Sequence, residues 1–170
     1  AGVLKNVKGN VALSERRSTD ALPTGDNKVI GVAENEKNKE IIFLVWNSNS
    51  NHGIYRLDLT TNKYQKLYQD SVLNLKKFSY AACNVIVNEE NETLFYWTDD
   101  VNPPMKVNVN RLAEGRYPSI LTSGTNEEKL LCLTVAKQRP LRAPTFSMVR
   151  NSSLEKNNIR EKHFQFAYRY

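Results

Sequence analysis

The stretch that decides the fold is Asn35-Glu36-Lys37-Asn38-Lys39-Glu40-Ile41-Ile42-Phe43-Leu44-Val45-Trp46-Asn47. A polar segment rich in Asn, Glu and Lys leads directly into an apolar run that ends on a tryptophan. Asn tolerates the left-handed backbone of a tight turn, and a short run of branched and aromatic residues is typical of a buried strand. The stretch therefore predicts a hairpin tip followed by a strand over Ile41–Trp46.

The same pattern of a polar turn followed by an apolar strand recurs further along the chain. Asn88-Glu89-Glu90-Asn91-Glu92 leads into Thr93-Leu94-Phe95-Tyr96-Trp97-Thr98-Asp99, and the two tryptophans lie 51 positions apart. A repeat of roughly 40 to 50 residues with four strands per unit is typical of β-propeller blades. We therefore expect an all-β, antiparallel fold of propeller-like blades, with a β-sandwich as the alternative because it would produce a similar pattern.

Short runs of β-branched and aromatic residues, separated by polar turns, predict the remaining strands. The expected strands are Val29–Ala33, Ile41–Trp46, Ile54–Leu59, Tyr64–Tyr68, Asn84–Val87, Thr93–Thr98, Lys106–Val109 and Leu130–Val135. Between the third and fourth strands, Asn62 stands where a tight turn needs positive φ. Helical spacing is limited to short stretches such as Ser71–Phe78.

The 170 residues suffice for one domain, and their charge is uneven. Residues 137–170 carry eight basic residues and two acidic ones, Glu155 and Glu161, so their net charge is +6. This equals the formal net charge of the whole chain. We place a boundary near Ala136, with blade-like repeats over 1–136 and a basic, extended connector and final strand over 137–170. Such asymmetry favours contact with nucleic acid or with the acidic face of a neighbouring subunit.

Aromatic residues accompany this charge, but they alternate strictly over Phe164–Tyr170. Strict alternation is typical of the buried face of a strand, which we favour over a single-strand-binding surface. The chain does not start with Met, and its last residues read as a strand in progress. We therefore expect a piece of a longer protein, with roughly three to four blades' worth of chain.

Motifs of the common enzyme and cofactor classes are absent from the sequence. There is no HExxH, no P-loop, no nucleophile elbow and no dinucleotide fingerprint. Of the two histidines, His52 is expected on the surface of a hairpin tip. Asp99-Asp100-Val101-Asn102 offers clustered oxygen ligands but lacks EF-hand spacing and is interpreted as a turn. We predict no enzymatic activity, no cofactor, no metal and no small-molecule substrate.

The cysteines and the apolar runs exclude two further classes. Cys83 and Cys132 lack metal-ligand spacing and are too few for a disulfide scaffold, so both are expected to be small core residues. The longest apolar run, Ile41–Trp46, is far shorter than the roughly 20 residues of a membrane helix. We therefore expect no membrane partner.

Three stretches, taken in order, resemble a known family. They are Val7–Asn10 with Leu22–Gly31, then Trp46–Ser48 with His52–Asp58, and finally Leu94–Val109, to which Phe164–Tyr170 adds a following strand. Their order is similar to that in the muzzle, or stabilisation, proteins of crAss-like and related short-tailed bacteriophages. Asp100 and Met105 depart from that pattern, since glycine and a basic residue are expected there.

The resemblance implies a structural protein of the virion, assembled in the host cytoplasm as a homo-oligomeric ring at the distal end of the tail. Its expected partners are other copies of itself, neighbouring tail proteins and, in passing, viral DNA leaving through the exit channel. The runner-up is a secreted or surface β-propeller that binds a glycan or peptide, and a propeller hydrolase is the third option. The expected subunit interface comprises Asn49, His52, Asp99, Asn102, Pro103, Pro104, Arg139, Arg142 and Arg150.

Overall fold

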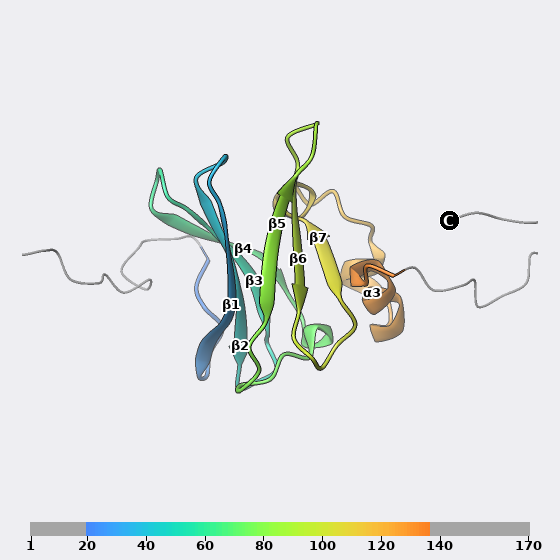
Figure 1. The fold of residues 1–170 in the computed structure, drawn as a ribbon. Helices are drawn as coiled ribbons and strands as arrows, with labels where there is room; N and C mark the ends of the chain where they lie inside the picture. The colour runs from blue at the N-terminus through green and yellow to red at the C-terminus, as the bar shows by residue number, and fades with distance from the viewer. Residues whose placement is uncertain (1–19, 137–170) are drawn as a thin grey trace, which may run out of the picture. The chain divides into compact units, whose positions relative to one another are not determined.

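A computed structural model describes residues 20–136 of the chain (Figure 1). The strands are β1 (Asn27–Asn35), β2 (Glu40–Asn47), β3 (Gly53–Asp58), β4 (Lys63–Gln69), β5 (Ala82–Val87), β6 (Thr93–Thr98) and β7 (Met105–Asn108). The helices are the 3-10 helix η2 (Ser71–Leu73), α1 (Val109–Ala113), α2 (Ile120–Ser123) and α3 (Asn126–Leu133).

The strands form two antiparallel sheets, each a simple meander. The first sheet has the order β1-β2-β3-β4 and the second the order β5-β6-β7, so every strand pairs with its neighbour in sequence. The expectation of an antiparallel all-β fold is confirmed for the described residues. Within that part of the chain, the sheets close into neither a barrel nor a propeller ring.

The two units of the sequence repeat occupy equivalent places in the two sheets. β1 and β2 flank the first Asn/Glu-rich hairpin, and β5 and β6 flank the second. The expected positive φ of Asn62 is confirmed at 54°, and Asn91 has a φ of 60° in the second hairpin. In the first hairpin, Lys39 rather than an asparagine takes the left-handed conformation, with a φ of 50°.

The main core lies between the two sheets. Alternate residues of β2, including Ile42 and Leu44, face Phe95 and Trp97 of β6 across this core. The rings of Phe95 and Trp97 stack with centroids 5.4 Å apart. Each such side chain contributes about 1.5–3 kcal/mol when it is fully buried, so the packing of one sheet on the other is a major source of stability.

The opposite face of the first sheet holds a second apolar cluster. Phe43 and Tyr55 stack there with centroids 5.6 Å apart, and Tyr64 meets Tyr55 edge to face. Leu22 packs against this cluster, and the carboxylate of Asp20 accepts a hydrogen bond from the backbone N–H of Lys66. Both faces of the first sheet are therefore apolar, which explains why β2 reads as a continuous apolar run rather than an alternating one.

The two sheets approach each other most closely at Gly31 on β1. A Cβ atom at this position would lie 2.6 Å from Cys83 Sγ and 2.8 Å from the carbonyl oxygen of Ala81. The backbone N–H of Ala81 donates to the carbonyl of Ile30, where a β-bulge shifts the register of β1 against β2. The bulge and the glycine together allow the first strands of the two sheets to lie side by side.

One predicted strand is wrong. Leu130–Val135 was expected to be extended, but most of it belongs to α3, which begins at a complete capping box formed by Thr125 and Glu128. This reciprocal pair satisfies two orphan N–H groups and starts a helix in an otherwise strand-like run. Only Thr134 and Val135 pair with the start of β7, through a bridge to Met105 and a bond from Val135 N to the carbonyl of Pro104.

Two other boundaries also differ from expectation. Val109 begins α1 instead of ending a strand, because the Asn108 side chain accepts a hydrogen bond from Arg111 N and caps the helix. The helical stretch expected around Ser71–Phe78 is reduced to η2, which Asp70 caps. The expected boundary at Ala136 stays a prediction, and the connector and final strand of residues 137–170 lie outside the described residues.

Candidate functional site

Four connecting segments meet at one end of the strands, which we call the loop end. They are residues 23–27, 47–53, 70–81 and 98–105, at the foot of the sheets in Figure 1. The N–H of Asp70 donates to the carbonyl of His52 at 3.0 Å, and Asn102 Nδ2 donates to the carbonyl of Leu73 at 3.2 Å. These bonds join segments that are distant in sequence, so the loop end is one connected surface.

The structure places six of the expected interface residues at this end, and their exposure differs. Asn49, Pro103 and Pro104 are exposed and Asn102 is half-buried, whereas His52 and Asp99 are buried. Asn49 is held in place, since its N–H donates to Asn47 Oδ1 and its Nδ2 to the carbonyl of Thr24. The other three expected residues, Arg139, Arg142 and Arg150, lie outside the described residues.

The expected surface position of His52 is wrong, because this side chain is only 5% exposed. Its Nδ1 accepts a hydrogen bond from the backbone N–H of Asn47 at 3.1 Å and so fixes the 47–52 turn. Burial lowers the pKa of His52, and the charge of Lys76 lowers it further. A neutral ring is what this bond requires, since a protonated Nδ1 could not accept.

Asp99 also holds a turn together. Its Oδ1 accepts from the backbone N–H groups of Val101 and Asn102, and its Oδ2 accepts from Asn102 Nδ2 at 2.7 Å. Both oxygens are therefore engaged within the Asp99–Asn102 turn. The next residue, Asp100, has a φ of 58°, a conformation that favours glycine.

A group of exposed aromatic and lysine side chains at the loop end was missed from the sequence. Phe78 is 88% exposed and Tyr80 81% exposed. Lys28 Nζ lies 5.4 Å from the centre of the Phe78 ring, and Lys77 Nζ lies 5.3 Å from the centre of the Trp46 ring. We call these residues, together with Lys76, the aromatic–lysine patch. The signal was the run Lys76-Lys77-Phe78-Ser79-Tyr80, of which Lys76–Phe78 was interpreted as the end of a short helix.

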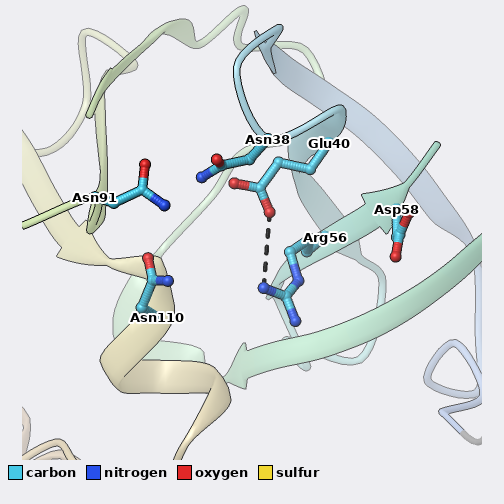
Figure 2. A pocket seen from close by; sticks show the side chains of 6 residues that line it. All are labelled: Asn38, Glu40, Arg56, Asp58, Asn91 and Asn110. Atoms are coloured by element: carbon cyan, nitrogen blue, oxygen red, sulfur yellow. Dashed lines mark ion pairs between the residues drawn. The ribbon is translucent and has the colours of Figure 1, made fainter. Parts of the chain in front are cut away.

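The opposite end of the strands, the hairpin end, contains a polar hollow of about 370 Å³ (Figure 2). The first sheet lines it with the β1–β2 hairpin, β2 and β3. The β5–β6 hairpin of the second sheet and helix α1 supply the rest. The lining residues are Asn38, Glu40, Arg56, Asp58, Asn91 and Asn110. The hollow therefore presents three carboxamides, the Glu40–Arg56 ion pair and the carboxylate of Asp58, with no apolar side chain among its lining residues.

A buried hydrogen-bond network lies behind this hollow and joins the two sheets. Thr93 Oγ1 donates to Glu40 Oε1 at 2.9 Å and accepts from the side-chain amides of Asn35 and Asn38, each at 3.1 Å. The other carboxylate oxygen of Glu40 lies 3.6 Å from the guanidinium of Arg56 (Figure 2). Because Thr93 belongs to β6 and Glu40 to β2, the network links the hairpin of one sheet to a strand of the other.

No protein family, curated protein or solved structure compared with this chain matches it. Among residues 20–136, no helix is long and apolar enough to cross a membrane. Within the same described range, no three His, Cys, Asp or Glu side chains gather in a way that could hold a metal ion. Cys83 and Cys132 are half-buried free thiols, and burial raises the pKa of Cys83 to about 11.

Proposed function

We propose that this chain is a structural component of a bacteriophage tail, a muzzle or nozzle protein that forms part of the distal ring and of the genome exit channel. The sequence resemblance suggests this class. The observation that carries the proposal further is the pair of consecutive meanders, each containing one copy of the repeat and packed face to face. This arrangement supports an interpretation of the two sheets as successive propeller-like blades.

Blades radiate from a central channel, so neighbouring blades pack face to face and their corresponding strands lie together. The first strands of the two sheets, β1 and β5, are neighbours here, and the glycine at position 31 permits their close approach. The second sheet has three strands against four in the first, and the α1–α3 segment follows β7. A ring built from such units would need further blades from elsewhere in the assembly.

We propose that each subunit contacts its neighbours through the loop end. Asn49, Pro103 and Pro104 are exposed there on turns whose backbones are fixed by Asn47 and Asp99. Preformed loops lose little conformational entropy on binding, which favours their use as contacts. Different surfaces on adjacent copies would then meet, as closure of a ring through heterologous contacts requires. The arginines at 139, 142 and 150 are proposed to contact the same neighbours.

The experiment that tests this proposal is proteomic and structural analysis of purified particles. We expect peptides of this chain in virions, and antibody labelling at the tip of the tail. A chain that is abundant in infected cells but absent from purified particles would refute the proposal.

The interface is tested separately with Pro103→Arg, which places a charged side chain at the exposed loop end. Thr61→Arg makes a comparable change at an exposed position of the hairpin end and is the matched control. We expect Pro103→Arg to remain folded by circular dichroism but to fail to enter particles, while Thr61→Arg enters normally. Equal incorporation of both variants would contradict the assigned interface.

A second candidate function is a secreted or surface propeller that binds a glycan or peptide, and the hollow in Figure 2 favours it. Carboxamides both donate and accept, as hydroxyl-rich or backbone-rich ligands require. A glycan array tests this function. If the chain bound a neutral saccharide and Asn110→Leu abolished that binding, the result would favour glycan binding over the tail assignment.

A further inference from the structure

The geometry points to the aromatic–lysine patch as a binding surface for single-stranded nucleic acid. The patch combines two highly exposed rings, Phe78 and Tyr80, with three lysines at the loop end. Nucleic-acid binding by these residues does not require the chain to be a tail component, so it can be tested independently of the proposed function.

The lysines of the patch lack carboxylate partners among the described residues. Lys28 Nζ donates to the carbonyl of Lys77 at 3.0 Å, and Lys76 Nζ donates to Asn74 Oδ1 at 2.7 Å. Lys77 Nζ lies near two aromatic rings, 5.3 Å from the centre of Trp46 and 6.0 Å from the centre of Phe78. Neutral partners orient these ammonium groups without cancelling their charge, so the patch retains a local positive potential.

Two acidic residues of the loop end are already engaged, whereas Asp26 and Asp100 are exposed there. Asp70 forms an ion pair with Lys129 at 2.7 Å and caps η2, and Asp99 is saturated by its own turn. The described residues as a whole carry 15 acidic against 12 basic side chains, so the positive patch contrasts with its own domain. An anion would therefore be attracted to the three lysines of the patch rather than to the loop end as a whole, which also carries Asp26, Asp70, Asp99 and Asp100.

Phosphate alone does not explain the exposed rings. Leaving two large aromatic side chains in water is unfavourable unless a partner covers them, and exposed apolar groups of this kind mark interaction sites. The bases of a single strand have free faces that stack on aromatic rings, while its phosphates meet the lysines. A duplex hides those faces within its own stack, and an acidic peptide would engage the lysines but leave the rings uncovered.

Recognition by such a surface would not depend on base sequence. Stacking tolerates every base, and lysine contacts to phosphate carry no sequence information. This surface differs from residues 137–170, whose strictly alternating aromatic residues are typical of a buried strand face. The basic residues of that segment would nevertheless attract any polyanion, so the aromatic side chains, rather than net charge, must decide the test.

The experiment uses the full chain and a fluorescein-labelled oligothymidylate of about 15 nucleotides, followed by fluorescence anisotropy. Phe78→Ala and Tyr80→Ala remove the stacking platforms, and Val101→Ala is the control because it truncates another exposed apolar residue of the loop end. We expect each aromatic substitution to weaken binding about fivefold or more, and Val101→Ala to leave it unchanged. Since all three side chains are exposed, their removal leaves the core intact.

The lysines are tested through the salt dependence of binding. Lys76→Gln with Lys77→Gln should lower the slope of log affinity against log salt by about 0.7 for each phosphate that a lysine no longer neutralises. Lys37→Gln with Lys63→Gln makes the same change in charge at the hairpin end and should leave the slope unchanged. Equal slopes for the two double variants would overturn the assignment of the patch.

Cross-linking of the unaltered chain provides a measurement that no substitution can disturb. A halogenated oligonucleotide irradiated on the chain should form adducts at Phe78, Tyr80 or Trp46. The inference would be overturned if adducts were confined to residues 137–170. It would also be overturned if the aromatic variants bound as the original chain does, or if no binding were detected at low salt. A duplex of equal length that binds as tightly as the single strand would overturn it as well, as would polyglutamate that competes equally well.

Discussion

Thr93→Val is the substitution that most directly tests how the two sheets are held together at the hairpin end. Thr93 is completely buried, and valine replaces its hydroxyl with a methyl group of similar size, so the change removes hydrogen bonds rather than volume. It removes one bond donated to Glu40 Oε1 and two accepted from Asn35 and Asn38. The carboxylate would then face a methyl group in place of a donor.

The expected loss of stability follows from what each partner retains. Glu40 Oε1 keeps the hydrogen bond from Asn35 Nδ2 at 2.8 Å, so the carboxylate retains a donor. The half-buried side chain of Asn38 can form hydrogen bonds with water in the hollow instead. The main loss is one hydrogen bond to a charged group, worth about 1.5–3 kcal/mol. Adding a few tenths of a kcal/mol for each amide, we expect the free energy of unfolding to fall by about 2–3 kcal/mol.

Urea denaturation followed by tryptophan fluorescence measures this change, with an unaltered m value showing that the folded state remains compact. Thr98→Val is the matched control, because it makes the same substitution at the exposed end of the same strand. It should change stability by less than about 0.5 kcal/mol. If Thr93→Val is equally mild, the network does not stabilise the contact between the sheets and the reasoning is refuted.

Three further substitutions test other features of the fold. Gly31→Ala should destabilise the protein by about 1–3 kcal/mol, because the new Cβ would overlap Cys83 Sγ and Ala81. In urea titrations, adding Cys83→Ala should recover part of this loss. An unchanged stability of Gly31→Ala would contradict the close approach of the two sheets. The pKa of His52 is lower in the folded protein, so the unfolded chain takes up the proton first and the original protein loses stability as the pH falls below about 6.5. His52→Gln removes this titration and should therefore flatten the pH dependence of stability in that range. Burial would raise the pKa of Asp70, but hydrogen bonds from Lys129 and Val72 N outweigh it and hold that pKa below its ordinary value. This contribution is present above about pH 4 and is lost as the pH falls, so Asp70→Asn should cost about 1 kcal/mol at pH 7 and progressively less in acid, as denaturation at several pH values would show.

The sequence predicts the sheets well because their signals are local. Strands such as Ile41–Trp46 and Thr93–Thr98 need only composition and flanking turn residues, and the positive φ of Asn62 follows from turn chemistry. The helix α3 was missed because its apolar run resembles a strand and only the Thr125–Glu128 capping box reveals a helix start. The Thr125-x-x-Glu128 signature is visible in the sequence, but the strand prediction for Leu130–Val135 rested only on the composition of the run that follows it.

The candidate surfaces were harder to predict because exposure depends on contacts between distant segments. His52 stands in a polar turn, and nothing local shows that Asn47 N and the passing 70–76 segment bury it. Phe78 and Tyr80 are aromatic residues that a sequence pattern assigns to a core by default. Their exposure follows from the path of the chain between η2 and β5, which is fixed by tertiary contacts rather than by periodicity.

The two ends of the sheets use their polar groups in opposite ways, and this difference is itself testable. At the hairpin end, polar side chains such as Glu40 and Thr93 satisfy one another, so their contribution is to stability. At the loop end, Phe78 and the neighbouring lysines are exposed, so we expect them to contribute to binding more than to stability. Thr93→Val should therefore lower the unfolding midpoint while oligothymidylate affinity stays constant under folding conditions, and Phe78→Ala should do the reverse. If one variant lowered both quantities in parallel, binding would be tracking the fraction of folded protein, and the separation of roles between the two ends would be wrong.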